Sequence, residues 1–68
     1  MNPLFRLTAR EQQVLVEIAR TGDPVTFVAA RLDMSYQTAK NHLSSAYRTL
    51  GVHNSTQAFI ALGWLVVR

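Results

Sequence analysis

The sequence has no cysteine, and this absence limits how so short a chain can be stabilised. Without thiols the chain can form neither a disulfide framework nor a thiolate metal site. Its 68 residues make one small domain, near the lower limit at which a single hydrophobic core suffices. Stability must therefore come from the packing of secondary structure elements or from a partner.

The chain also lacks an apolar segment long enough to cross a membrane. Its most apolar stretch, 58–67, is ten residues long, whereas a membrane-spanning helix needs roughly 20. The N-terminus has no charged region followed by an apolar region, which a secretory signal would have. We therefore expect a cytoplasmic protein, bacterial or phage-like, with no membrane partner.

Acidic residues are missing from the whole second half of the sequence. Up to residue 33 the arginines and the carboxylates are equal in number, so their charges sum to zero. After residue 33 the charged residues are only cations: Lys40, Arg48 and Arg68. A polyanion that approaches this half meets no like charge, so the charge distribution permits a nucleic acid partner.

The chain offers too few chemical groups for an active site. Its four carboxylates mostly occupy expected cap or surface positions, and it has no glycine-rich phosphate loop and no nucleophile–base pair. The histidines, His42 and His53, stand eleven residues apart without a cysteine to help them bind a metal. We therefore expect no enzymatic activity, no cofactor and no metal.

Apolar residues recur at helical spacing in four segments, and no segment has the pattern of a strand. The sequence therefore predicts an all-α, four-helix domain over residues 1–68. The helices are expected at about 9–21, 24–32, 36–50 and 55–67. Residues 1–7 are expected to form an extended arm, from which Leu4 and Phe5 fold back on the core.

Each predicted helix starts at a capping residue: Thr8, Asp23, Ser35 or Asn54. Glu11 and Gln57 stand three residues after the first and last of these caps, which is the spacing of a capping box. Pro24 follows its cap as a first helical residue. Gly22 and Gly51 are placed to end the first and third helices.

The second and third predicted helices are joined by a turn of about three residues. Asp33 can adopt a left-handed conformation more readily than most residues, which suits a tight turn. Two helices joined in this way form the helix-turn-helix pattern, whose second helix enters the major groove of DNA. Many small helical domains contain the same corner without binding DNA. The pattern alone is therefore compatible with a DNA-binding domain and with a domain that does not bind DNA.

The third predicted helix has a narrow apolar stripe and a polar face that is free of acids. The stripe consists of Ala39, Leu43, Ala46 and Leu50. The positions that then point outward are Gln37, Lys40, Asn41, Ser44, Ser45 and Arg48. Lys40 can donate to guanine or phosphate and Asn41 can pair with adenine. Because an ordinary solvated face more usually carries Glu–Lys pairs, we expect this face to contact DNA.

Three segments carry a resemblance to a known family: "LTAREQQVL", "VAARLDMSYQTAKNHL" and "LGVHNSTQA". In this order and spacing they resemble the LuxR/GerE-type (NarL/FixJ-type) DNA-binding domain over about residues 7–62. The resemblance implies a transcriptional regulator whose third helix reads the major groove and whose fourth helix mediates dimerisation. Most relatives append this domain to a receiver or ligand-sensing domain, whereas this chain looks like the stand-alone, GerE-like kind.

The chain departs from the family pattern at four positions: Phe27, Ala39, Thr49 and Ser55. At these positions the family usually has, in the same order, an acidic or polar residue, a valine, a lysine and an arginine. Two basic residues are thus missing, so fewer charges are available for phosphates. We expect weaker DNA binding per monomer or a different role.

Two further side chains of the third helix have two interpretations each. Thr38 could contact a phosphate or could form a local hydrogen bond that helps to start the helix. His42 matches a frequent histidine of the family that flanks the groove and reaches phosphate, or it packs on the flank of the helix.

The fourth predicted helix has more apolar surface than so small a domain can cover. The positions expected to face inward are Ala58, Phe59, Leu62 and Leu65. The positions expected to form an exposed homodimer interface are Ile60, Ala61, Gly63, Trp64 and Val67. The alternative is that Trp64 folds back over the arm.

Two functions of different classes are compatible with these features. The first is a dimeric, sequence-specific regulator that binds double-stranded DNA at two half-sites, nucleoid-associated when bound. The second is an anti-activator-like interaction module that pairs with a larger LuxR-type regulator through its fourth helix. The acid-free face of the third helix and the family resemblance favour the first, whereas the missing basic residues and the surplus apolar surface are the reason to consider the second.

Overall fold

The computed structural model describes residues 3–65, and the side chains of residues 5–65. The chain forms a short 3-10 helix, η1 (Pro3–Arg6), and then four α-helices. These are α1 (Ala9–Thr21), α2 (Val25–Arg31), α3 (Tyr36–Leu50) and α4 (Ser55–Ala61). Residues 3–65 contain no strand, and the predicted all-α, four-helix fold is confirmed.

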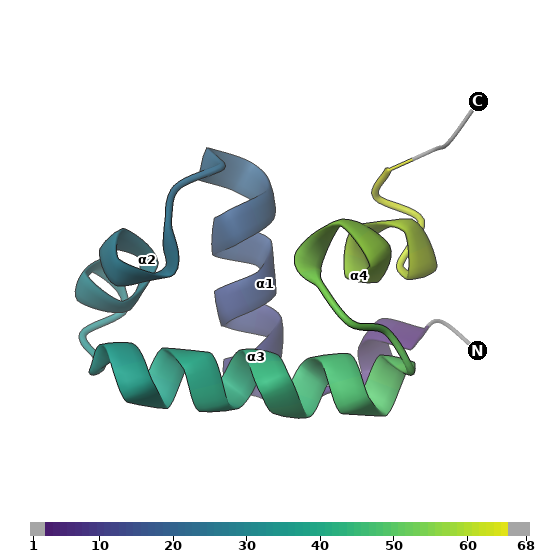
Figure 1. The fold of residues 1–68 in the computed structure, drawn as a ribbon, viewed down its shortest axis with the longest axis horizontal. Coiled ribbons are helices and arrows are strands. Elements are labelled where there is room, and N and C mark those ends of the chain that lie inside the picture. The colour runs from purple at the N-terminus through teal and green to yellow at the C-terminus, as the bar shows by residue number, and fades with distance from the viewer. Residues whose placement is uncertain (1–2, 66–68) are drawn as a thin grey trace.

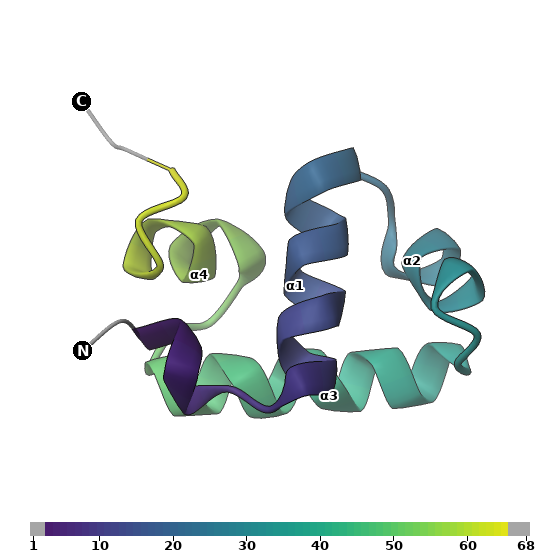
Figure 2. The same cartoon turned by 180° about the vertical axis from the view of Figure 1, so that it is seen from behind.

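The longest helix, α3, has the other described helices on one side of it (Figure 1). α1 stands across its middle, α2 lies over its N-terminal end and α4 over its C-terminal end. Figure 2, from behind, places η1 at the same end as α4. No described helix covers the opposite side of α3, so that side is open to another molecule.

The core lies where α1, α2 and α4 meet α3. Its largest fully buried side chains are Leu15, Val14 and Val28. The inward apolar stripe predicted for α3 is confirmed, because Ala39, Leu43 and Ala46 are buried. The fourth member, Leu50, is half-buried and packs against the core. Since alanine is small, the neighbouring helices can approach α3 closely along this stripe.

Most of the predicted caps are confirmed. Oγ1 of Thr8 accepts from the amide of Glu11 at 3.1 Å, and Oε1 of Glu11 accepts from the amide of Thr8 at 2.9 Å. These two bonds complete the capping box of α1. Gly22 and Gly51 end α1 and α3 in the left-handed conformation, each with a φ of 70°.

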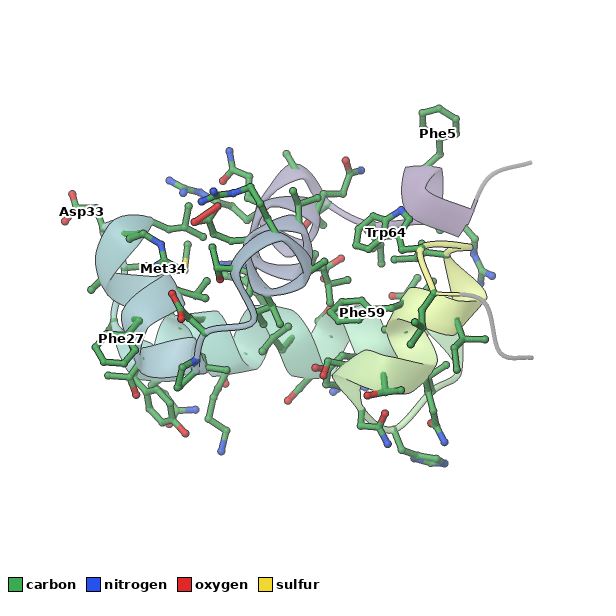
Figure 3. The ribbon with its side chains drawn as sticks, turned by 90° about the horizontal axis from the view of Figure 1, so that it is seen from above. Phe5, Phe27, Asp33, Met34, Phe59 and Trp64 are labelled. Carbon is green, nitrogen blue, oxygen red and sulfur yellow. The ribbon has the colours of Figure 1, made fainter. Side chains whose placement is uncertain are left out.

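The N-terminal segment differs from the extended arm predicted for residues 1–7. Pro3–Arg6 form a 3-10 turn, since the fixed φ of proline suits the first turn of a helix. Leu7 instead of Phe5 joins the core: Leu7 is 6% exposed, whereas Phe5 is 75% exposed and points outward (Figure 3). The side chain of Leu4 lies outside the described residues.

The start of α2 also differs from the prediction. Pro24 is the N-cap, α2 begins at Val25, and no side chain caps it. The carboxylate of Asp23, predicted to be the cap, accepts from Nη1 of Arg31 at 2.9 Å instead. A hydrogen bond to a guanidinium is stronger than one to a neutral amide, so the ion pair takes the capping group away.

α4 ends at Ala61, well short of the predicted end near residue 67. Gly63 has a φ of 79°, and the amides of Gly63 and Trp64 donate to the carbonyls of Ile60 (3.0 Å) and Phe59 (2.8 Å). This is the Schellman motif, a helix end that glycine favours because it has no Cβ. Gly63 therefore terminates α4, where the sequence suggested a packing surface.

The early end of α4 changes the environment of Leu65. This residue, predicted to face inward, is 44% exposed, because the chain has left the helical path that would have turned it to the core. Val67 lies outside the described residues.

The burial of Leu15 supports a prediction about stability. Leu15→Ala should lower the free energy of unfolding by about 2–5 kcal/mol, because it removes apolar contacts and leaves a cavity at the centre of the helices. Val16→Ala is the matched control, since Val16 is 44% exposed and its truncation should change stability by less than about 0.5 kcal/mol. Urea unfolding measures both, and equal losses for the two variants would contradict the placement of the core.

Candidate nucleic-acid interface

The turn between α2 and α3 fixes the angle between the two helices. Asp33 has a φ of 57°, the left-handed conformation predicted for it. The amide of Met34 donates to the carbonyl of Ala29 at 3.0 Å. Met34 points inward against the core while Asp33 points to solvent (Figure 3). The corner is therefore a helix-turn-helix that presents α3.

The outward face of α3 carries a row of polar residues, which we term the α3 stripe: Gln37, Lys40, Asn41, Ser44 and Arg48. All of them are exposed, as the sequence predicts. Their spacing of three or four residues places them on one side of the helix. The stripe contains no acid, and the sequence has none after residue 33.

Neighbouring side chains orient the members of the α3 stripe. Nε2 of Gln37 donates to Oδ1 of Asn41 at 2.9 Å, which directs the amide group of Asn41. An amide oxygen has two lone pairs, so Asn41 can keep this bond and accept a second one. Nζ of Lys40 lies 5.7 Å from the centre of the Tyr36 ring, within the range of a cation–π contact.

The cations of the α3 stripe are not neutralised by the part of the chain that the structure describes. The ion pairs among residues 3–65 join Glu17 to Arg20 and Arg31, and Asp23 to Arg31. Lys40 and Arg48 take part in none of them, so their charges are available to an anion.

Thr38 is exposed at the start of α3, and its hydroxyl is held locally. Oγ of Ser35 donates to Oγ1 of Thr38 at 2.8 Å, and the amide of Thr38 donates to Oγ of Ser35 at 3.1 Å. The local hydrogen bond that the sequence offered as an alternative to a phosphate contact is therefore present. The hydroxyl remains able to donate, because the bond from Ser35 uses it as an acceptor.

His42 and Ser45 lie on the flank of α3, beside α1. Both are half-buried, and the side chain of Ser45 helps to lower the pKa of the Glu11 carboxyl. Ser45, predicted to point outward, is thus only partly exposed, because it lies on the side of α3 that is next to α1. The half-buried position of His42 fits the interpretation in which its ring packs on the flank of the helix.

Glu11 is 5% exposed and connects the start of α1 to this flank of α3. Burial raises the pKa of the Glu11 carboxyl, but hydrogen bonds with Ser45 and Thr8 and the charge of His42 outweigh burial. The pKa therefore lies below its ordinary value of 4.5. Sequence reasoning found the capping box and missed this second role, since no local pattern shows which residue of another helix faces Glu11.

Two further carboxylates, Glu17 and Asp23, hold α2 against the end of α1 through Arg31. Glu17 accepts from Arg20 at 2.7 Å and from Arg31 at 2.9 Å, and the hydrogen bond with Arg20 is the main cause that lowers the pKa of Glu17. Arg31 also bonds Asp23 and Thr21. Arg20 and Arg31 are thus balanced by nearby acids, as the sequence predicts.

A second surface, apolar in character, lies beside α4. Ile60 and Trp64 are 40% and 39% exposed, and a shallow groove between Trp64 and α1 is lined by Val16, Ala19 and Arg20. The Trp64 ring lies 5.9 Å from that of Phe59, between α1 and α4 (Figure 3). Of the alternatives for Trp64, packing over Phe5 is not what the structure shows, because Phe5 points away from it.

Ala61 and Gly63 are exposed beside Ile60 and Trp64, so the predicted outward positions are confirmed where they are described. The apolar surface extends onto α1, which sequence reasoning missed. Val16 on α1 is 44% exposed.

Among residues 3–65, no three histidine, cysteine or acidic side chains are grouped so that they could hold a metal ion. In the same residues no helix is both long and apolar enough to span a membrane.

The corner of α2 and α3, with an exposed and acid-free outer face, defines a helix-turn-helix domain. The pattern of the luxR family of bacterial regulatory proteins matches residues 6–62, which is most of the chain. The chain belongs to this family of DNA-binding transcription regulators. The resemblance found in the sequence is thereby confirmed.

Several longer proteins match the same region. The chain is 42% identical over 57 residues to a probable transcriptional regulatory protein, SgaR, of Hyphomicrobium methylovorum, with 84% of this chain and 26% of the relative aligned. It is 42% identical over 59 residues to a nitrate/nitrite response regulator homologue of Haemophilus influenzae, with 87% and 28% aligned.

A third relative is the glycerol metabolism activator of Pseudomonas putida, 33% identical over 60 residues, with 88% of this chain and 27% of the relative aligned. The chain therefore spans about a quarter of the length of these relatives. No solved structure matches the chain significantly.

The lowered pKa of Glu11 predicts a pH-dependent contribution to stability. A carboxyl whose pKa is lower in the folded state stabilises the fold above the unfolded value of 4.5, and this contribution is lost as the pH falls through the folded value. Glu11→Gln should therefore cost about 1 kcal/mol at neutral pH, the usual loss when a helix cap is weakened. This loss of stability should become smaller when the pH falls below the pKa of Glu11 in the unfolded chain.

Urea unfolding between neutral pH and pH ~3 measures this difference between the two proteins. Asp33→Asn is the control, since Asp33 is exposed and its substitution keeps a residue that tolerates the left-handed conformation. A stability difference between Glu11→Gln and the unchanged chain that is the same at every pH would contradict the account of Glu11.

Proposed function

We propose that the chain is a sequence-specific DNA-binding module of a transcription regulator and that α3 lies in the major groove. The observation that carries the proposal is the exposed, acid-free α3 stripe on the second helix of a helix-turn-helix. Family membership supports the same function. In this role the protein works in the cytoplasm and is nucleoid-associated when bound.

The α3 stripe supplies contacts of two kinds. Lys40 donates to O6 and N7 of guanine or to a phosphate, and Asn41 pairs with adenine through its amide. Ser44 is short and allows the helix backbone to come close to the bases. Thr38, at the edge of the stripe, would donate to a phosphate, a contact that fixes the position of the helix without reading sequence. His42 would do the same only where its ring swings out from the flank of the helix.

Dimerisation is part of the proposal because each monomer has few free cations. Two chains joined through Ile60, Trp64 and the exposed residues beside them place two copies of α3 on half-sites about one helical turn apart. The second copy doubles the number of phosphate contacts, and each neutralised phosphate steepens the dependence of log affinity on log salt by about 0.9.

A base-reading role for Asn41 has a measurable signature. Asn41→Ala should cost about 1–3 kcal/mol on the selected site and should relax the preference at one base pair, because the bidentate contact with adenine is lost. In vitro selection of duplexes followed by mobility-shift titrations measures both effects. Arg48→Gln is the comparison: it should weaken binding to all sequences alike. A uniform loss of affinity for Asn41→Ala would contradict base reading.

The apolar surface leads to a separate prediction about mass. Ile60→Glu should convert a dimer into a monomer without unfolding it, since Ile60 is exposed on the single chain and a charge at the centre of an interface is costly to desolvate. Sedimentation equilibrium or light scattering measures the mass. Phe27→Ser is the control, because Phe27 is 58% exposed at the opposite end of the molecule (Figure 3). A monomeric unchanged chain would refute this interface.

One observation favours a second candidate function. The exposed apolar surface is not confined to α4: it includes the groove beside Trp64 and the exposed side chains of Val16 and Leu65. Exposed apolar patches of this kind usually mark a site where another protein binds. An interaction module that pairs with a larger LuxR-type regulator would use this surface and leave the α3 stripe idle. Capture of such a regulator by the purified chain, combined with no retardation of any duplex, would favour this function over the first.

A further inference from the structure

A shallow groove lies at the C-terminal end of α3, where the chain turns toward α4. Its lining residues are Ser44, Tyr47, Arg48, Gly51, Val52 and His53. Ser44 and Arg48 belong to the α3 stripe, so the groove continues the stripe beyond the helix. None of the lining residues is acidic, and the sequence has no acid after residue 33.

The walls of this groove are held by packing and hydrogen bonds. Tyr47 and Val52 pack against the core. Burial raises the pKa of the Tyr47 hydroxyl, an effect that Ser55 at the start of α4 offsets only in part, so the phenol stays neutral. The amide of Val52 donates to the carbonyl of Tyr47 at 2.9 Å.

Gly51 provides the sharp turn that opens the groove. Its φ is 70°, and a Cβ added there would meet no atom within 4 Å, so the space in front of its backbone is open. The turn continues into the cap of α4, where Asn54 accepts from the amide of Gln57 at 2.9 Å. Oε1 of Gln57 accepts from the amide of His53 at 2.8 Å, one residue earlier than the capping box that the sequence predicts. These bonds fix the backbone that carries the His53 ring.

The polar side chains of the groove are free to bind a ligand. Within the described part of the chain, Arg48 and His53 form no side-chain hydrogen bond or ion pair, and both are exposed. Arg48 supplies a guanidinium fork, His53 at least one ring N–H and Ser44 a hydroxyl. Donors that converge without an acid nearby are the chemistry that recognises a phosphate.

We propose that this groove binds a phosphate of the DNA backbone beside the base pairs that α3 contacts, and that His53 is one of its ligands. The inference rests on the proposed function. Lys40 and Arg48 are eight residues apart, which is about 12 Å along a helix. The major groove is also about 12 Å wide. When the first half of α3 meets the bases, its last turn therefore reaches a wall of phosphates.

The site is tested by adding and removing charge. His53→Lys places a permanent cation in the groove, so binding should become tighter at low salt, and the slope of log affinity against log salt should become more negative by about 0.9. Arg48→Gln should make the slope less negative by about the same amount. Fluorescence anisotropy with a pool of random-sequence duplexes suits this test, because a phosphate contact does not depend on sequence.

Asp23→Asn is the matched control. It raises the net charge by one unit, as His53→Lys does, in the loop that follows the end of α1 directed away from α3 (Figure 1). If His53→Lys and Asp23→Asn change the slope equally while the unchanged chain binds duplex, the phosphate site is overturned and the proposed function stands. If the unchanged chain retards no duplex at low salt, both fail.

Nuclear magnetic resonance distinguishes a backbone phosphate from a free anion. The ring signals of His53 should shift on addition of duplex and should respond much less to inorganic phosphate at the same ionic strength. An equal response to inorganic phosphate alone would overturn the assignment to DNA.

Discussion

The burial of one side of α3 against the other three helices is the interaction on which the rest of this structure depends. An isolated helix of this length is marginal in water, and α3 owes its position to Ala39, Leu43 and Ala46, which are buried along a single stripe. Because these apolar residues must face inward, the polar residues of the α3 stripe on the opposite side of the helix must face outward. The orientation of the face that we propose to read DNA is thus decided by buried apolar residues on the opposite side of the helix.

The distribution of charge follows from the same arrangement. Three of the four acids are used within the domain: Glu11 closes the capping box, and Glu17 and Asp23 hold the arginines of α1 and α2. The α3 stripe keeps its cations unpaired within the described residues. Few charges are involved, so the proposed affinity for DNA requires that each of them meets a phosphate or a base.

Local signals in the sequence are sufficient for the helices and most of their ends. The capping box of Thr8, the Ser35 cap and the left-handed Asp33 each depend on residues within a few positions, and the structure has all of them. The apolar stripe of α3 likewise follows from spacing alone. These features were predictable because no residue from a distant part of the chain offers the same groups an alternative partner.

The errors in prediction occur where a residue has a partner far along the chain or a choice of conformation. Asp23 is a good capping residue and is drawn instead to Arg31 on α2. Ser45 has the spacing of an exposed residue and is half-buried on the flank beside α1. Gly63 fits both a close helix contact and a helix end, and only the Schellman bonds show which it is. The stand-alone arrangement and the dimer stay predictions.

The most direct test of the central claim is a map of the amide signals that shift when a selected duplex is added to the chain. The account predicts the largest shifts in the N-terminal half of α3, from Gln37 to Ser44, and at the turn around His53, with little change along the ion pairs of α1 and α2. Shifts confined to the apolar surface around Val16, Ile60 and Trp64, or no shifts at all, would contradict it.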